Sequence, residues 1–217
     1  MSKVIAFSGG CFSGKTTAMQ AVKKSLENAG CKVTVLDELI RTVTDKPIDV
    51  IRWDSSEYLE LQDKIIRGKI AQEIKAFEDE SDTIYLVDRA ITDSLFYLQN
   101  YVDKSSLSSN EMKVFCELHK DTIQHARRAF QHARRAFGCP SDDSGYFAVV
   151  EFKPLVGKNT DLLRPMHIDY SKEFEHDAIH ILNLSFRYSS SVPFKYVDLN
   201  ESDVQNLVSS IHKFLKC

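Results

Sequence analysis

Gly9-Gly10-Cys11-Phe12-Ser13-Gly14-Lys15-Thr16 matches the phosphate-binding loop pattern G-x-x-x-x-G-K-[ST], which is the strongest indication of the fold in this sequence. The residues before it, Val4-Ile5-Ala6-Phe7, are typical of a short buried strand, and those after it are apolar at helical spacing as far as Asn28. In a strand–loop–helix unit, loop amides and the positive end of the helix bind nucleotide phosphates. The context therefore favours a nucleotide site over a glycine turn that contains Lys-Thr by chance.

The loop offers both backbone amides and side chains to a nucleotide. We predict that Lys15 bridges phosphate oxygens of ATP and that the Thr16 hydroxyl ligates Mg²⁺, so ATP and Mg²⁺ are the expected cofactors. The expected cofactor-binding residues are Gly10, Cys11, Phe12, Ser13, Gly14, Lys15, Thr16 and Thr17.

Strand and helix signals alternate along the 217 residues. The pattern predicts strands at 4–7, 32–36, 83–87, 146–152 and 194–198, and helices at 15–29, 55–78, about 90–137, 169–185 and 201–215. Strands separated by helices form right-handed βαβ units. We predict an α/β fold of the three-layer P-loop NTPase type, with about five parallel strands, helices on both faces and a small mobile lid.

The whole chain, residues 1–217, is expected to form a single domain with three special segments. They are a helical substrate-side segment at about 50–80, an arginine-rich helix at about 108–137 and a lid loop at about 155–166. The lid is expected there because glycine, polar residues and a bounding proline mark a loop that can close.

Composition limits the class of protein. A chain that is 43% hydrophobic can bury one substantial core, and a net charge of -3 gives no overall attraction to nucleic acid. The five cysteines form no C-x-x-C pair, which argues against a disulfide framework and a zinc site. No apolar run approaches the ~20 residues of a membrane span, and the start lacks the order of a signal peptide. We expect a cytoplasmic protein without membrane contact.

The predicted strand at 32–36 ends in two acidic residues, Asp37 and Glu38, and Arg41 follows three residues later. Ligands of open parallel sheets bind beyond the carboxyl ends of the strands. Either carboxylate could act on a substrate hydroxyl or its metal, and Arg41 would share their face if the chain turns helical. The alternative is a solvated helix start, where acidic residues are favoured.

The predicted strand at 83–87 ends in Asp88 and Arg89. P-loop enzymes hold Mg²⁺ with an acidic residue at this place, and Arg89 beside it could bind a phosphate with two hydrogen bonds. The alternative is a structural ion pair between the two residues. Asp93, in the helix that follows, is expected to be no more than an N-terminal cap.

Between these strands, a helical arc of apolar residues is expected to face the core, and Gln62 falls outside that arc. Its members are Leu59, Ile66, Ile70, Ile74 and Phe77. Gln62 is therefore either an exposed surface residue or a polar group that faces a substrate.

The heptad Gln-His-Ala-Arg-Arg-Ala-Phe occurs twice in tandem, at 124–130 and 131–137. Seven residues nearly complete two helical turns, so both copies present the same faces. Alanines and phenylalanines share one arc, and the arginines, glutamines and histidines occupy the rest. The four arginines, Arg127, Arg128, Arg134 and Arg135, could bind ATP or the phosphates of DNA, or they could form a solvated face.

Together these features resemble the P-loop kinases of nucleosides and nucleotides over nearly the whole length. The nearest likenesses are the nicotinamide-riboside-kinase-like ATPases, the deoxynucleoside kinases and the thymidylate kinases. The resemblance is carried by the phosphate loop, Glu38-x-x-Arg41, Asp88-Arg89 followed by Asp93-Ser94-Leu95 and Tyr97, and a late polar segment with Arg164. Thymidylate kinases usually have Pro-Gly after the acid of the second strand, and Glu38-Leu39-Ile40 departs from that pattern.

The resemblance implies roles for individual residues. Glu38, or Asp37 beside it, would be the general base or hydroxyl ligand, and Gln62 would pair with a base edge. Asp88 would hold Mg²⁺ with Thr16. Three arginines, Arg41, Arg89 and Arg164, would contact phosphates, with Arg164 on the lid.

We predict an ATP- and Mg²⁺-dependent phosphotransferase acting on a nucleoside or nucleoside monophosphate. One alternative is a kinase acting on a modified base or an end of DNA or RNA, which the arginine heptads support. The other is a nucleotide-dependent ATPase switch, although the sequence has no separate Walker-B Asp-Glu pair. Kinases of this kind are often dimers, so a homodimer is a further expectation.

Overall fold

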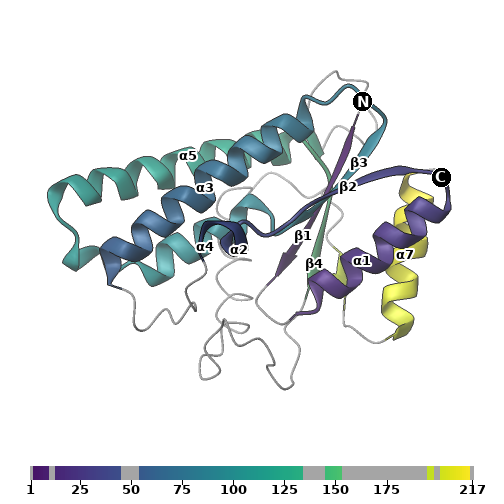
Figure 1. Cartoon of the computed structure of the whole chain (residues 1–217), viewed down its shortest axis with the longest axis horizontal. Coiled ribbons are helices and arrows are strands. Elements are labelled where there is room, and N and C mark those ends of the chain that lie inside the picture. Colours follow the sequence, from purple (N-terminus) through teal and green to yellow (C-terminus); the bar gives the residue numbers. More distant parts are fainter. Residues whose placement is uncertain are drawn as a thin grey trace.

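A parallel five-stranded sheet lies between two layers of helices in the computed structural model, which describes residues 2–9, 13–44, 54–133, 145–152, 195–197 and 201–215 (Figure 1). The strands are β1 (Lys3–Gly9), β2 (Lys32–Leu36), β3 (Thr83–Asp88), β4 (Tyr146–Phe152) and β5 (Lys195–Val197). Their order is β2-β3-β1-β4-β5, and every neighbouring pair is parallel. The predicted α/β fold of the P-loop NTPase type is confirmed.

The helices divide between the two faces of the sheet. They are α1 (Lys15–Asn28), α2 (Ile40–Val43), α3 (Ser55–Phe77), α4 (Ile91–Tyr101), α5 (Ser109–Ala133) and α7 (Glu201–Leu215), with a 3₁₀ turn at Lys104–Ser106. Figure 1 shows α1 and α7 on one side of the sheet and α3, α4 and α5 on the other. The predicted lid loop and the predicted helix at 169–185 lie outside the described residues.

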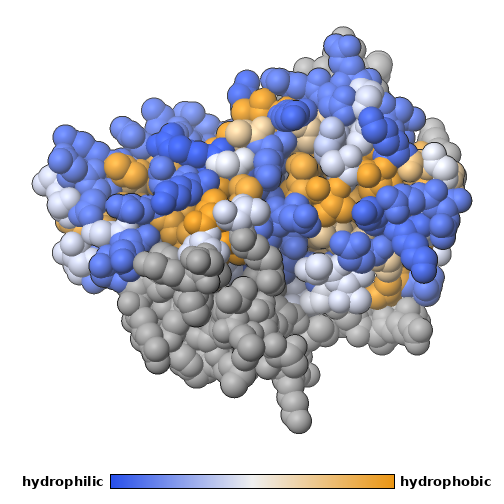
Figure 2. Space-filling view, in the orientation of Figure 1, coloured by the Kyte–Doolittle hydropathy of each residue, from blue (hydrophilic) through white to orange (hydrophobic). Residues whose placement is uncertain are grey.

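The central strand β1 is buried on both faces, and this explains its unbroken apolar run. Ile5 and Phe7 pack against α1 and α7, whereas Val4 and Ala6 pack against α3 and α5. Successive side chains of a strand point to opposite faces, so β1 joins the two cores. Figure 2 shows hydrophilic residues over much of the described surface, with hydrophobic residues exposed between them.

The predicted helical stretch at about 90–137 is interrupted between α4 and α5. Asp103 begins a turn in which its carboxylate accepts the Ser105 N–H at 3.0 Å. Ser108 and Glu111 then form a reciprocal cap: the Ser108 N–H donates to Glu111 at 2.7 Å, and the Glu111 N–H donates to Ser108 at 3.4 Å. This S-x-x-E cap starts a new helix.

The helices α3, α4 and α5 share a core of their own beside the sheet. It contains Tyr58, Leu59, Leu61, Ile66, Leu98, Val102, Phe115 and Leu118. Because α3 packs against both other helices, its buried arc is wider than the sequence predicts, and Gln62 is buried within it. The placement of Gln62 outside the buried arc was wrong. No described helix has the length and apolar character needed to cross a membrane.

The backbone of β1 at Gly9 lies so close to β4 that a side chain there would overlap with Phe152. Its φ is 144°, and a Cβ atom there would lie 2.8 Å from the Phe152 carbonyl oxygen. Gly30 also has a positive φ, 83°, but a Cβ atom there would meet nothing within 4 Å. We expect Gly9→Ala to lower the free energy of unfolding by about 3 kcal/mol, from strain plus overlap, and Gly30→Ala by about 1 kcal/mol.

Denaturant unfolding of the two variants measures this difference. Gly30→Ala is the matched control, because it carries the backbone strain without the steric overlap. Equal losses in the two variants would show that the close approach to Phe152 does not matter.

Candidate functional site

The ends of three strands meet beside the phosphate loop. Leu36 of β2 pairs with Val87 of β3, and Asp88 of β3 pairs with Phe7 of β1. The residues that follow β2 therefore lie level with the end of β3, next to the loop that leaves β1. This is the arrangement that the strand ends in the sequence predicted.

The described part of the phosphate loop leads directly into α1. Gly14 has a left-handed conformation with φ 78° before the helix, and the first turn contains no acidic residue. The first helical hydrogen bond runs from the Ala18 N–H to the Gly14 carbonyl at 3.1 Å. The N–H groups of the first turn of a helix have no acceptor within the helix, and they favour an anion at its N-terminus. Gly10, Cys11 and Phe12 lie outside the described residues.

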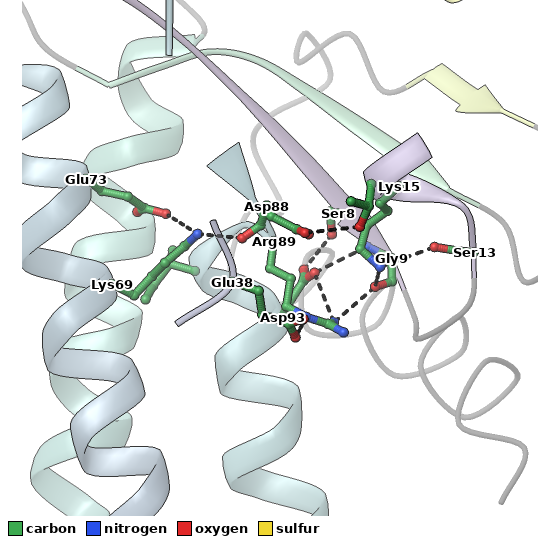
Figure 3. A network of polar contacts seen from close by, with 12 residues as sticks. Ser8, Gly9, Ser13, Lys15, Glu38, Lys69, Glu73, Asp88, Arg89 and Asp93 are labelled. Carbon is green, nitrogen blue, oxygen red and sulfur yellow. Dashed lines mark hydrogen bonds and ion pairs between the residues drawn. The ribbon is translucent and has the colours of Figure 1, made fainter. Parts of the chain in front are cut away.

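The ammonium group of Lys15 is folded back over the loop. It is buried, and its Nζ atom donates to the Gly9 carbonyl at 2.8 Å and to the Ser13 hydroxyl at 3.2 Å. Figure 3 shows these residues together at the end of β1. The loop thus carries a buried cation that is held by a backbone carbonyl and a side-chain hydroxyl of the loop itself.

Thr16 and Asp88 bring two oxygen donors together at the start of α1. The Thr16 hydroxyl donates to Asp88 Oδ2 at 3.4 Å, and Asp88 is buried while Thr16 is exposed. Among the described residues, no three His, Cys, Asp or Glu side chains form a metal cage. One carboxylate and one hydroxyl fit Mg²⁺, which keeps several waters and takes substrate phosphates as further ligands.

Arg89 is the centre of the polar cluster at the strand ends (Figure 3). Its Nε atom donates to Glu38 Oε1 at 2.5 Å, and its Nη1 atom donates to the Gly9 carbonyl at 3.2 Å. Nη1 also lies 3.8 Å from Asp93 Oδ2, and the guanidinium carbon lies 5.1 Å from the centre of the Tyr97 ring. Arg89 therefore pairs with the carboxylate of Glu38, which follows β2, and with that of Asp93 in α4, rather than forming the pair with Asp88 that the sequence left open.

Asp93 has a larger role than the helix cap that the sequence suggested. The N-cap of α4 is Ala90, and Asp93 is the third residue of the helix, in its first turn and fully buried. It accepts from the Ser8 hydroxyl at 2.5 Å and from the Gly9 N–H at 3.2 Å. Burial raises the pKa of Asp93 to about 6, against the opposing effects of Arg89 and the Ser8 hydrogen bond. The sequence did not identify Asp93 as part of the site.

The structure distinguishes the two acidic residues after β2. The Glu38 side chain is 15% exposed and contacts Arg89, whereas Asp37 is exposed. The chain turns helical at Ile40, as the placement of Arg41 required, but the Arg41 side chain lies outside what the structure describes. Arg164 is also outside it. The geometry therefore supports Glu38 most directly.

A second buried polar cluster borders the site, and the sequence analysis missed it. Lys69 Nζ donates to the Asp88 carbonyl at 2.8 Å and lies 3.7 Å from Glu73 Oε1. Glu73 also contacts His125 and Tyr146, from α5 and β4. The spacing Ile66, Lys69, Ile70, Glu73 and Phe77 places both charges on the apolar arc of α3, and this signal could have revealed them.

The duplicated heptad does not lie at the phosphate loop in its described part. Arg127 and Arg128 are exposed and line a groove of about 710 Å³ between α3 and α5, together with Arg67 and apolar residues such as Ile70. His125, which the helical arc placed among the polar residues, is buried against Glu73 because α3 presents a carboxylate there. Arg134 and Arg135 lie outside the described residues.

Comparison with known proteins agrees with the fold. The family described as "AAA domain" matches residues 4–144. A solved structure described as "Crystal structure of NadR protein in complex with NR" has a TM-score of 0.64 at 14% identity, and the match covers 100% of this chain and 52% of that one. No curated protein matches.

A second solved structure, "Crystal structure of NadR protein in complex with NAD and AMP-PNP", has a TM-score of 0.59 at 12% identity, with 100% of this chain and 50% of that chain covered. The chain thus spans about half the length of both structures, and at such identity the likeness shows the fold alone. The resemblance to P-loop kinases that the sequence indicated is confirmed at that level.

The pKa of Asp93 predicts a pH dependence of stability. Its folded value of about 6 exceeds the ordinary 3.8, so between these values the folded chain holds a proton that the unfolded chain has released. The contribution of Asp93 to the free energy of unfolding is greatest below about pH 4 and falls as the pH rises through about 6, by ~3 kcal/mol in all. Asp93→Asn should lack this change.

Denaturant unfolding from pH 4 to pH 8 measures the difference in free energy between Asp93→Asn and the unmodified protein. We expect this difference to move by about 3 kcal/mol in favour of the variant as the pH rises. Asp82→Asn, which removes an exposed carboxylate, is the control. A difference for Asp93→Asn that stays constant across the range would contradict the assignment.

Proposed function

We propose, from the premise that the chain belongs to the AAA domain family and has a P-loop NTPase fold, that it transfers a phosphoryl group from ATP to a nucleoside or nucleoside monophosphate. The contact between Glu38 and Arg89 carries this proposal. It places a carboxylate beside the loop at an edge of the sheet where a second molecule can approach the phosphates.

The donor half of the proposed site is the phosphate loop. The start of α1 would hold the phosphates of ATP by its amides and its positive end, and the buried Lys15 ammonium would contact their oxygens. Thr16 and Asp88 would hold Mg²⁺, which neutralises charge on the phosphates when bound. The loop residues Gly10, Cys11 and Phe12 would add further amides.

The acceptor half is the pair of residues at the ends of β2 and β3. With a nucleoside acceptor, a hydroxyl would attack the γ-phosphorus, the bond to the bridging oxygen would break, and ADP would leave with that electron pair. The hydroxyl proton passes to the Glu38 carboxylate. Arg89 stays charged because a guanidinium is not deprotonated in proteins, so it can stabilise the negative charge of the transferred group. Asp37, Arg41, Gln62 and Arg164 are proposed to help bind the acceptor and the phosphates.

The similar solved structures support the choice of acceptor. One contains NR and the other contains NAD and AMP-PNP. A fold that holds such molecules in a related protein is suited to a nucleoside-like acceptor beside a nucleotide. We therefore include NR among the first acceptors to be tested.

A polynucleotide acceptor is favoured by one observation, the exposure of Arg127 and Arg128 along the groove between α3 and α5. Phosphate contacts by such residues would make binding strongly dependent on salt. The screen below therefore includes DNA and RNA ends, and DNA-dependent transfer with no transfer to free nucleosides would replace the proposed acceptor.

The proposed donor site predicts that Lys15→Ala abolishes transfer. Labelled ATP is incubated with nucleosides, their monophosphates, NR, DNA and RNA, and products are separated and counted. We expect the rate of phosphoryl transfer to the best acceptor to fall at least about 100-fold, because the Lys15 ammonium no longer stabilises negative charge on the phosphates. Lys24→Ala, which removes an exposed lysine from the same helix, should keep the rate.

The acceptor role predicts a different result for Glu38→Gln. We expect kcat to fall about 100-fold or more, since the carboxamide cannot take the proton, while calorimetry still detects ATP binding. Glu60→Gln, an exposed change on α3, is the control. ATP hydrolysis without a phosphorylated product in the unmodified protein would favour an ATPase switch instead.

A further inference from the structure

The turn after β3 is held in a strained conformation. Arg89 has φ 69°, and it is the one non-glycine residue with a positive φ in the described part of the chain. Such a conformation is costly for a residue with a Cβ atom and persists only where the surroundings fix it. Because this turn carries both Asp88 and Arg89, whatever fixes it also sets the geometry of the proposed reaction.

Hydrogen bonds from other elements hold this turn on both sides. On one side, Lys69 Nζ of α3 donates to the Asp88 carbonyl at 2.8 Å. On the other, the Ile91 N–H donates to the Tyr146 hydroxyl of β4 at 3.0 Å. Between them, the Arg89 N–H donates to the Phe7 carbonyl at 3.0 Å. Hydrogen bonds to the residues on both sides of Arg89, and one from its own N–H, therefore hold the strained conformation.

Glu73 connects the two side-chain anchors. Its Oε1 atom lies 3.7 Å from Lys69 Nζ and accepts from the Tyr146 hydroxyl at 2.6 Å, and its Oε2 atom accepts from His125 Nε2 at 2.8 Å. Glu73 is fully buried, and Lys69, Tyr146 and His125 are at most 5% exposed. Figure 3 shows Glu73 beside Lys69, and Lys69 reaching Asp88 from the side opposite to Lys15.

Stability alone does not explain a buried ion pair at this place. Removing two charges from water is costly, and well-packed apolar residues of similar volume often stabilise a protein as well or better. Lys69 and Glu73 lie on the arc of α3 that also carries Ile66, Ile70 and Phe77, where apolar residues would fit the pattern. Apolar side chains, however, could not bond to the Asp88 carbonyl or to the Tyr146 hydroxyl.

We propose that Lys69, Glu73 and Tyr146 are positioning residues that hold the Asp88–Arg89 turn in the geometry needed for phosphoryl transfer. This rests on the proposed function. The three residues touch neither ATP nor the acceptor in this scheme. They act through the backbone of the turn, and a small displacement of Asp88 and Arg89 lowers the rate steeply because transfer depends on alignment.

Two variants test the proposal without leaving either Lys69 or Glu73 as an unpaired buried charge. Tyr146→Phe removes one hydroxyl and keeps the ring, and Lys69→Met/Glu73→Leu replaces the ion pair by apolar residues of similar size. We expect kcat to fall about tenfold or more in each, a larger change than the rise in KM for ATP, because the phosphate loop is intact. Thr122→Val is the control, since it removes a buried hydroxyl of α5 that bonds to the Leu118 carbonyl of its own helix.

A second measurement separates this proposal from the proposed function. Calorimetry gives the affinity for ADP with and without Mg²⁺, and needs no acceptor. If Asp88 is displaced, the gain in affinity that Mg²⁺ brings should be at least about threefold smaller in Tyr146→Phe than in the unmodified protein and in Thr122→Val. This result would support the positioning role even if no acceptor were ever phosphorylated.

The proposal is overturned if folded Tyr146→Phe and Lys69→Met/Glu73→Leu keep both the kcat and the Mg²⁺-dependent gain of the unmodified protein. It is also overturned if Thr122→Val loses as much as they do, because the effect would then be one of general stability. If the unmodified protein transfers no phosphoryl group but the expected differences in Mg²⁺-dependent ADP affinity among the variants are observed, the proposed function is rejected and the positioning role is still supported.

Discussion

The carbonyl oxygen of Gly9 is the point on which the site depends, because two buried cations converge on it. Lys15 reaches it from α1 at 2.8 Å, and Arg89 reaches it from the end of β3 at 3.2 Å. Two cations are stable this close in a buried place only if negative charge lies near them. Glu38 and Asp93 supply that charge beside Arg89. The ends of β1, β2 and β3 and the start of α4 are therefore joined electrostatically as well as by apolar packing.

The strands and helices could be predicted because each is indicated by a local apolar pattern in the sequence. The strands at 32–36 and 146–152 and the helix at 201–215 have the predicted bounds, since burial on a sheet or helix face leaves a regular apolar pattern. The phosphate loop and the strand ends predicted that Lys15, Glu38, Asp88 and Arg89 lie near one another. In the structure Arg89 contacts Glu38, Lys15 and Arg89 share the Gly9 carbonyl, and Asp88 contacts Thr16 next to Lys15. Parallel topology was the only further assumption this required.

The buried polar residues could not be predicted in the same way, because each depends on a partner far along the chain. Glu73 is 52 residues from His125 and 73 from Tyr146, and Asp93 is 85 residues from Ser8. A polar residue on a helix is usually solvated, so local pattern alone assigns such residues to the surface. The hydrogen bonds that stabilise these buried residues form only where α3 meets α5 and β4, and where α4 meets β1.

Asp88 belongs both to the strand ends at the phosphate loop, which the sequence predicted, and to the buried polar contacts of α3, which it did not. Its carboxylate faces the Thr16 hydroxyl at the phosphate loop, and its carbonyl accepts from Lys69 on α3. The same helix reaches the core of α3, α4 and α5 through Tyr58 and Leu59. A shift of α3 along the sheet must therefore either break the hydrogen bond from Lys69, which leaves a buried donor without that acceptor, or carry Asp88 with it. The helical layer and the end of β3 thus form one mechanical unit, and the alignment of the proposed phosphate site is set partly by helices that do not touch it.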